Sequence, residues 1–307
     1  MVREAAPAGI GRLNGRPSTI GEGPPPDALS NPLREKMIRM PLQCPRAGTV
    51  TTMTVAPICA GMSSVYDGKV TALIVAGASS AALDPLAERA GVSDKYLVPV
   101  DGMPMIERLV MNATMSPRIG TIRIAAGEAD EIAAIPSIAK LVDKGRLAFT
   151  SEAFDMVDSM FADADGASYP ILITTADNCL WLPRDFTEFA DKAIASKAAA
   201  AAAIARKEDV IAVDPVRQGR CYEFSDGGYS SCNTYWIADA CAPSLADIMR
   251  SSEEFAMYPF RMAEASQRDG FELVPIVMEH GYCAIAVNDE HSLHVTEKLL
   301  MKRLATA

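Results

Sequence analysis

The chain has 307 residues, of which 49% are hydrophobic and 22% charged, a composition typical of a soluble globular protein that can bury a large core. Its formal net charge is −10, and no cluster of five or more Lys or Arg interrupts this acidic balance. Nucleic acids and anionic membrane surfaces repel such a chain, so we expect neither as a partner. No strongly apolar run approaches the length of a membrane span, and we expect a cytoplasmic protein without membrane insertion.

The cysteines of the sequence are odd in number, and no two of them form a Cys-x-x-Cys pair. A zinc site or a disulfide framework would require tighter and more regular spacing. We therefore expect reduced, mostly buried thiols. The cysteines are Cys44, Cys59, Cys179, Cys221, Cys232, Cys241 and Cys283.

Residues 1–68 differ in composition from the rest of the chain. They hold 9 of the 20 prolines and 8 of the 20 glycines, and no helical or strand period survives in them. This pattern predicts a disordered leader, or else a start codon assigned too early, with Met53 or Met62 as the true start. The prolines disfavour a targeting helix. Residues 69–307 are expected to form one domain.

From Lys69 onward, short apolar runs alternate with segments of helical spacing. This alternation predicts an α/β fold, a three-layer α/β/α sandwich around a mostly parallel mixed sheet. Residues 198–205 either extend a helix or form a strand, and a turn is expected at 207–209. The segment 221–237 alternates like a hairpin. Strands are expected at 70–76, 121–126, 169–175, 271–278 and 284–287, and helices at 104–115, 129–143 with a break near Pro136, 152–162, 184–196 and 290–304.

The first candidate binding element is the turn that follows the strand at 70–76. Small residues after a parallel strand let backbone N–H groups approach a phosphate, and ligands bind at the carboxyl ends of such strands. By itself the pattern fits a plain tight turn equally well, because it matches neither Gly-x-Gly-x-x-Gly nor a P-loop. The candidate residues are Ala76, Gly77, Ala78 and Ser79.

A second candidate begins at Lys95, which precedes the stretch Leu97-Val98-Pro99-Val100-Asp101-Gly102-Met103-Pro104-Met105-Ile106. The string from Leu73 to Leu109 resembles the amino-terminal signature of the MobA-like nucleotidyltransferases. That signature is a strand with a Gly-rich loop, then a Lys, then Leu-x-Pro-Val-x-Gly-x-Pro-Met-Ile opening a helix. The resemblance implies a Rossmann-like nucleotide-diphospho-sugar transferase (GT-A-like) fold and a catalytic, nucleotide-binding Lys95. An isolated Lys would more often be a solvated surface residue.

A third candidate is Asp177, which follows the apolar strand at 169–175, where the sheet presents its ligand edge. The resemblance implies that Asp177 is catalytic and binds the Mg²⁺ that bridges the triphosphate. Taken alone, an Asp at this position would be a helix N-cap or a turn residue.

Two further residues complete the site that the resemblance implies. Asn288 follows the predicted strand at 284–287 and corresponds to a second metal contact, with Asp289 as the alternative if the register slips by one. Asn233, in Ser231-Cys232-Asn233-Thr234, resembles the substrate-side Asn segment of the family.

The sequence also departs from the family pattern. The glycine loop of the family usually carries an Arg, whereas residues 78–83 hold none and Arg89 is the nearest. Where some relatives place an extra Lys, only Arg261 is basic. Many relatives have two Asp where this chain has Ala286 and Asn288.

The resemblance therefore implies a Mg²⁺-dependent enzyme that transfers a nucleoside monophosphate from a nucleoside triphosphate to a small phosphorylated or alcohol acceptor and releases pyrophosphate. The departures leave two alternatives open, a degenerate nucleotide-binding protein without catalysis and a GT-A-type glycosyltransferase. The sequence names neither the base nor the acceptor, and it leaves a homo-oligomer open.

Overall fold

The computed structural model describes residues 68–76, 83–126, 129–150, 169–224, 226–238 and 258–306. The expected leader apart from Gly68, the expected helix at 152–162, and residues Gly77, Ala78 and Ser79 of the expected turn lie outside these ranges. Within them, no helix is long and apolar enough to cross a membrane.

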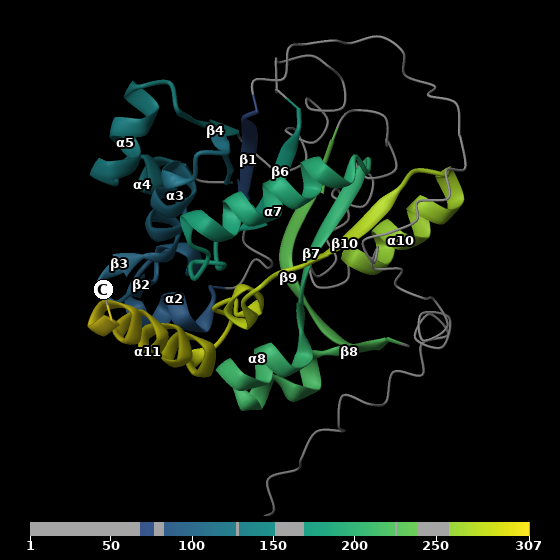
Figure 1. Cartoon of the computed structure of the whole chain (residues 1–307). Helices are drawn as coiled ribbons and strands as arrows, with labels where there is room; N and C mark the ends of the chain where they lie inside the picture. The colour runs from purple at the N-terminus through teal and green to yellow at the C-terminus, as the bar shows by residue number, and fades with distance from the viewer. Residues whose placement is uncertain are drawn as a thin grey trace, which may run out of the picture. The chain divides into compact units, whose positions relative to one another are not determined.

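The strands of the main sheet are β1 (Val70–Val75), β4 (Ile119–Ala125), β5 (Leu147–Thr150), β6 (Ile171–Thr175), β7 (Ala200–Arg206), β8 (Tyr222–Phe224), β9 (Gly227–Ile237) and β10 (Leu273–Val277). Together they form one mixed sheet in the order β10-β7-β9-β6-β1-β4-β5, with β8 paired to β9 (Figure 1). β9 runs antiparallel to β6, β7 and β8, and the other neighbouring strands run parallel to one another. The predicted mostly parallel mixed sheet is confirmed.

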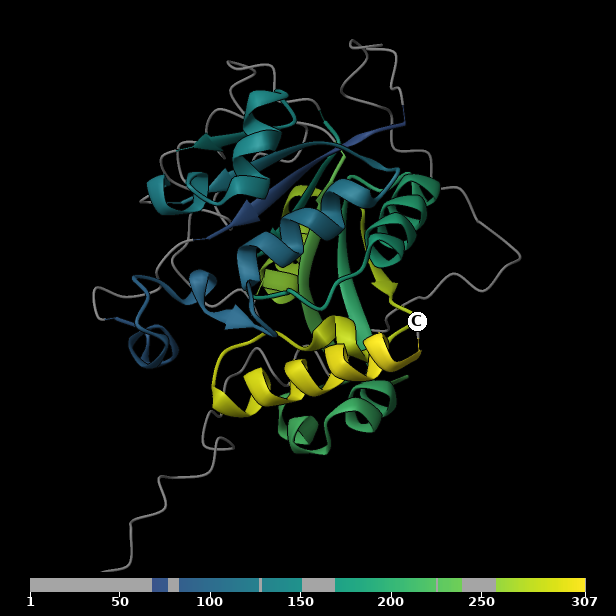
Figure 2. The same ribbon diagram turned by 90° about the vertical axis from the view of Figure 1, so that its left-hand side faces the viewer.

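The helices are α2 (Pro85–Ala90), α3 (Met105–Met115), α4 (Asp130–Ala133), α5 (Pro136–Asp143), α7 (Pro183–Ser196), α8 (Lys207–Val213), α10 (Tyr258–Asp269) and α11 (Glu290–Thr306). Three 3₁₀ turns join them within the described residues, η2 (Lys95–Leu97), η3 (Pro215–Arg220) and η5 (Gly281–Ala284). Figures 1 and 2 both show α11 beside α8, close to one end of the sheet.

Helices cover both faces of the sheet. Successive side chains of β1 point to opposite faces, so Ile74 joins the core cluster that contains Phe186 of α7, whereas Leu73 joins the cluster that contains Met262 of α10. All four side chains are fully or almost fully buried. Burial of an aliphatic or aromatic side chain of this size stabilises the fold by about 1.5–3 kcal/mol. The structure therefore has the predicted three layers.

Most expected elements are present, and one open alternative is resolved. The alanine-rich segment at 198–205 becomes β7, because its small side chains are buried between β9 and β10 rather than exposed on a helix. Helix propensity of Ala is overridden here by the tertiary environment. The expected break near Pro136 separates α4 from α5.

Two expectations were wrong. Residues 207–209 do not form a turn but begin α8, where Glu208 and Asp209 in the first turn complement the helix dipole. Residues 284–287 do not form a strand, because the end of η5 is followed by non-repetitive backbone at 285–288. Their apolar side chains are buried by packing against neighbouring elements and not by pairing in the sheet.

Candidate active site

The stretch that carries the family resemblance folds as a tight hairpin. β2 (Pro99–Val100) pairs antiparallel with β3 (Met103–Pro104). Asp101 and Gly102 form the two-residue turn, with φ angles of 51° and 74°. Two positive φ angles are required by a type I′ turn, which Asp-Gly favours. The hairpin leads directly into α3, which explains why the motif needs a Gly followed by a helix start.

Lys95 lies just before this hairpin, at the first position of η2. Its neighbours Tyr96 and Leu97 are buried, and the Tyr96 hydroxyl donates to Asp94 Oδ2 at 2.9 Å. These contacts hold η2 against the core, while the Lys95 side chain remains 27% exposed. The local fold therefore presents an ammonium group on a fixed base.

Asp177 follows β6 at the point where the strand order of the sheet reverses. The chain runs from β1 through β4 to β5 and then places β6 on the other side of β1. Open α/β sheets bind ligands in the crevice beyond the carboxyl ends of strands at such a reversal. The amide of Ala176 donates to the Val75 carbonyl at 3.0 Å, which fixes the two strand ends side by side.

The structure brings three of the predicted residues together. Lys95 Nζ donates to Asp177 Oδ2 and to Asn288 Oδ1, at 2.9 Å in each case. The amide of Val287 donates to the Asp177 carbonyl at 3.1 Å, so the segment that carries Asn288 is also tied to the end of β6 through its backbone. Asp177 lies 82 positions after Lys95 in the chain and Asn288 lies 193 positions after it, yet both side chains contact its ammonium group.

The oxygen atoms of this cluster fit a Mg²⁺ ion. Asp177 is 12% exposed, and its Oδ1 atom is buried without a hydrogen-bond partner in the described structure. Mg²⁺ prefers carboxylate and carbonyl oxygens, and usually binds one or two carboxylates together with substrate phosphates. No group of three or more His, Cys, Asp or Glu within the described ranges could hold a metal alone. Asp177 and Asn288 therefore suit an ion that is bound jointly with phosphate oxygens.

The start of α11 places the side chain of Asn288, and not that of Asp289, beside Lys95. Asp289 Oδ1 accepts from the Ser292 amide at 2.7 Å and from its hydroxyl at 2.6 Å, so this carboxylate caps the helix. The amide of Asn288 donates to Ser292 Oγ at 2.9 Å, while its side-chain oxygen faces Lys95. Asn288 is the residue in the cluster.

Ala76 cannot offer its amide to a phosphate. The residue is buried, and its N–H donates to the Ala125 carbonyl at 2.8 Å, which continues the sheet. Any phosphate contact from this turn must come from Gly77, Ala78 or Ser79, and these residues lie outside the described part of the chain.

Asn233 lies in β9, next to the end of β6. Its φ angle is 48°, an uncommon left-handed conformation, at a point where the pairing of β7 and β9 shifts register. The neighbouring Asn178 is buried and donates from Nδ2 to the carbonyls of Cys232 at 3.0 Å and Asn233 at 3.3 Å. Asn178, which sequence reasoning did not single out, thus ties this irregular part of β9 to the residue after Asp177.

Arg89 and Arg261, the basic residues nearest to positions where the family carries Arg or Lys, are not among the side chains bonded to Lys95. The exposed Arg89 on α2 pairs with Glu290, and this pairing raises the pKa of the guanidinium. Arg261 lies on α10, the helix whose Met262 packs on the face of the sheet opposite to the one that α7 covers.

Cys179, two residues after Asp177, is not suited to act as a nucleophile. The residue is fully buried, and burial raises the pKa of its thiol to about 12. Nucleophilic and metal-binding cysteines react as thiolates, which such a pKa suppresses near neutrality. Chemistry at this site must therefore proceed without a covalent intermediate on Cys179.

Comparison with known proteins identifies the fold and no closer relationship. No protein-family model matches the chain, and no curated protein is similar to it. A hypothetical transferase from Thermus thermophilus has 19% sequence identity and a TM-score of 0.53, over 73% of this chain and 99% of its own.

A second solved structure, the 4-diphosphocytidyl-2C-methyl-D-erythritol synthase from Anaerococcus prevotii, has 12% identity and a TM-score of 0.51, over 76% of this chain and 100% of its own. These likenesses confirm the predicted Rossmann-like nucleotide-diphospho-sugar transferase fold. The finer resemblance to the MobA-like family stays a prediction from the sequence motif.

Proposed function

We propose that this protein is a nucleotidyltransferase that moves a nucleoside monophosphate from a nucleoside triphosphate to a small phosphorylated or alcohol acceptor. The convergence of Lys95, Asp177 and Asn288 on one point at the strand-order reversal carries this proposal. The motif around Lys95 supports the proposal independently. The fold shared with the 4-diphosphocytidyl-2C-methyl-D-erythritol synthase also supports it.

The reaction requires one bond to form and one to break. An acceptor oxygen attacks the α-phosphorus, the bond from that phosphorus to its bridging oxygen breaks, and pyrophosphate leaves with the electron pair. An alcohol acceptor also loses its proton to solvent or base. Such transfer depends on positioning and electrostatic stabilisation and needs no covalent nucleophile on the protein.

Each residue of the cluster has a distinct task in this proposal. Lys95 binds the phosphates and neutralises charge that develops on the leaving pyrophosphate. Asp177 and Asn288 would hold Mg²⁺, which would supply Lewis-acid polarisation of phosphate oxygens. Asn233 orients the nucleotide or acceptor from β9.

The glycosyltransferase alternative is disfavoured by the residues that follow Asp177, above all by Cys179. A GT-A-type site usually holds its metal on an Asp-x-Asp, and this chain has Asp177-Asn178-Cys179. The Asn178 amide is buried and donates to the β9 backbone, and Cys179 is buried as a protonated thiol. Neither residue can therefore take the place of the second carboxylate.

The proposal is tested by a pyrophosphate-release assay with each of four nucleoside triphosphates, Mg²⁺, and a panel of sugar phosphates and polyols. Lys95→Ala and Asp177→Ala should each lower kcat by about 10²- to 10³-fold, the usual effect of removing an electrostatic contact to the transition state. Lys144→Ala and Asp143→Ala are matched controls, because both residues are exposed at the end of α5.

Folding of each variant is checked by circular dichroism. Full activity in Lys95→Ala or Asp177→Ala would refute the assignment of the site. Nucleotide binding without pyrophosphate release, across the whole panel, would instead identify the degenerate nucleotide-binding protein.

A further inference from the structure

The segment that carries Asn288 forms no strand of the sheet, and a backbone bond, from the Val287 amide to the Asp177 carbonyl, ties it to the end of β6. Residues 285–288 form neither helix nor strand, although their partners in the cluster lie on η2 and at the end of β6. A loop of this kind loses conformational entropy when one side chain must stay in place, so other contacts have to restrain it. The structure shows such contacts on the side of α8 and η3.

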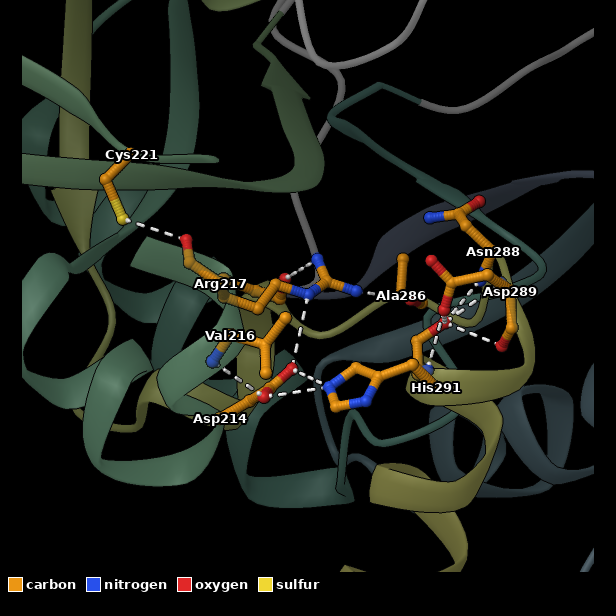
Figure 3. Close-up of polar contacts among 10 residues, drawn as sticks. Asp214, Val216, Arg217, Cys221, Ala286, Asn288, Asp289 and His291 are labelled. Carbon is orange, nitrogen blue, oxygen red and sulfur yellow. Dashed lines mark hydrogen bonds and ion pairs between the residues drawn. The ribbon is translucent and has the colours of Figure 1, made fainter. Parts of the chain in front are cut away.

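Arg217 of η3 holds the beginning of this segment. The residue is 8% exposed, and its guanidinium donates to the Ala284 carbonyl at 3.3 Å and to the Ala286 carbonyl at 2.8 Å (Figure 3). A guanidinium presents its donors in a rigid planar fork, so two bonds to one short stretch of backbone fix its course. In place of a strand partner, a side chain satisfies these carbonyls.

Asp214 links Arg217 to the far end of the segment. This carboxylate is 2% exposed, accepts from the Val216 amide at 3.2 Å, and lies 3.8 Å from Arg217 Nε. Both of its oxygens lie 3.0 Å from His291 Nε2. Because an ionised carboxylate can only accept, the imidazole Nε2–H donates. Figure 3 shows Asp214 between Arg217 and His291, with Asn288 on the same side as Asp289.

A close approach between backbones restrains the same region. A Cβ atom at Gly281 would lie 2.2 Å from the carbonyl carbon of Asp209, so only Gly allows η5 to pack this tightly on α8. The α8–η3 unit therefore touches the chain before Asn288 at Gly281, Ala284 and Ala286, and after it at His291.

We propose that Arg217, Asp214 and His291 form a positioning clamp that sets the Asn288 amide oxygen beside Asp177 for joint binding of metal and triphosphate. The inference rests on the proposed function and deepens it, since it names residues that act on the site through Asn288. None of the three contacts Lys95 or Asp177 through a bond that the structure shows, so their effect on ligand affinity must pass through the backbone they hold.

The test uses isothermal titration calorimetry of the full chain with the α,β-methylene analogues of ATP, CTP, GTP and UTP, each with Mg²⁺. His291→Ala is the main variant, because its side chain is 47% exposed and its loss leaves the core intact. We expect affinity for the best-bound analogue to fall on the order of tenfold, as when an outer partner of a metal site is removed. His294→Ala, an exposed His on the same helix, is the matched control and should bind like the wild type.

Two further variants distinguish positioning from simple structural support. His291→Gln keeps a side-chain N–H for Asp214 and should recover most of the lost affinity. In an Asn288→Ala background, His291→Ala should cause no further loss, because residues that act through one contact are not additive. Arg217→Lys, which keeps a buried cation but loses the fork, should weaken binding in the same non-additive way.

The outcomes separate the two proposals. If Asn288→Ala weakens binding but His291→Ala does not, or if their effects multiply, the clamp is refuted and the proposed function stands. If the wild type binds none of the four analogues, both proposals fall. Non-additive loss with recovery by Gln, at unchanged thermal midpoints, supports the clamp.

Discussion

At the scale of single residues, Lys95 has two partners that the proposed metal would also use. Its ammonium donates at 2.9 Å to one oxygen of Asp177 and to the Asn288 amide oxygen. The Lys95 ammonium therefore contacts the same two side chains that the proposed metal would bind. On the proposed function, Lys95 would give up these oxygens to the metal and bind the triphosphate instead, so metal and nucleotide would bind together.

Removal of the Lys95 ammonium should therefore change metal binding and catalysis in opposite directions. Lys95→Met removes the competing cation, so the variant should bind Mn²⁺ alone more tightly than the wild type, although it loses pyrophosphate release. Electron paramagnetic resonance of free Mn²⁺ measures the binding directly. Equal or weaker Mn²⁺ binding by the variant would show that Lys95 does not compete for the site, and Lys144→Met provides the control.

The residues of the site differed in how far the sequence could predict them. Lys95 and Asp177 stand at recognisable positions, one before a turn motif and the other after an apolar strand, and the family resemblance singled them out where each residue alone would be read as a surface or turn residue. Asp214 and Arg217 have no such signal, because a buried ion pair that holds distant carbonyls looks like an ordinary surface pair in the sequence. Their role depends on a contact between η3 and residues about 70 positions further on.

At the scale of elements, apolar periodicity predicted those strands and helices that are defined by packing on the sheet. It failed where burial comes from irregular backbone. Ile285 and Val287 are as buried as strand residues, yet the carbonyls around them are satisfied by Arg217. A short apolar run alone cannot distinguish the two cases. The strand β5 and the short helix α2 were not predicted, because each carries too few periodic residues.

The start of α7 provides a prediction about pH. Asp185 is fully buried in the first turn, where its carboxylate accepts from the Leu182 amide at 2.8 Å and from the Tyr282 hydroxyl at 3.0 Å. Burial, the largest influence, raises the pKa of Asp185 above its ordinary value, and the Leu182 hydrogen bond opposes it. The folded state thus binds a proton more tightly than the unfolded state.

Because the folded pKa is raised, the contribution of Asp185 to stability is fully present below the unfolded pKa of about 4 and is lost as pH rises through the folded pKa. Asp185→Asn removes this titration with little change in shape. The difference in unfolding free energy between wild type and variant should therefore shift in favour of the variant as pH rises above about 4. Urea unfolding at a series of pH values measures it, and a difference independent of pH would contradict the prediction.

At the scale of the whole molecule, the order of strands decides where the site lies. The placement of β1 between β4 and β6 was not predicted, because alternation of elements gives the fold class without the strand order. In that order β1 and β6 end side by side, and the segment before α11 is bonded to the end of β6 through the Val287 amide.

Nucleotide binding should stabilise the whole domain. A ligand that binds only the folded state at 100 times its Kd adds about 2.7 kcal/mol. For a domain of this size, that corresponds to a rise in Tm of roughly 5 to 10 °C. Differential scanning fluorimetry with Mg²⁺ and each triphosphate measures the shift. A shift of the same size in Asp177→Ala would place the nucleotide elsewhere on the protein.

The long sequence separation between Lys95 and its two partners has a consequence for the synthesis of the protein. Asp177 follows Lys95 by 82 positions, and Asn288, just before α11, follows it by 193 positions. Chains emerge from the ribosome with the N-terminal side first. A nascent chain that has not yet released Asn288 and His291 carries Lys95 and Asp177 without their third partner and without the clamp. On the proposed function, the ability to hold a nucleotide would therefore be acquired late in synthesis, when α11 joins a sheet whose strands have all been translated.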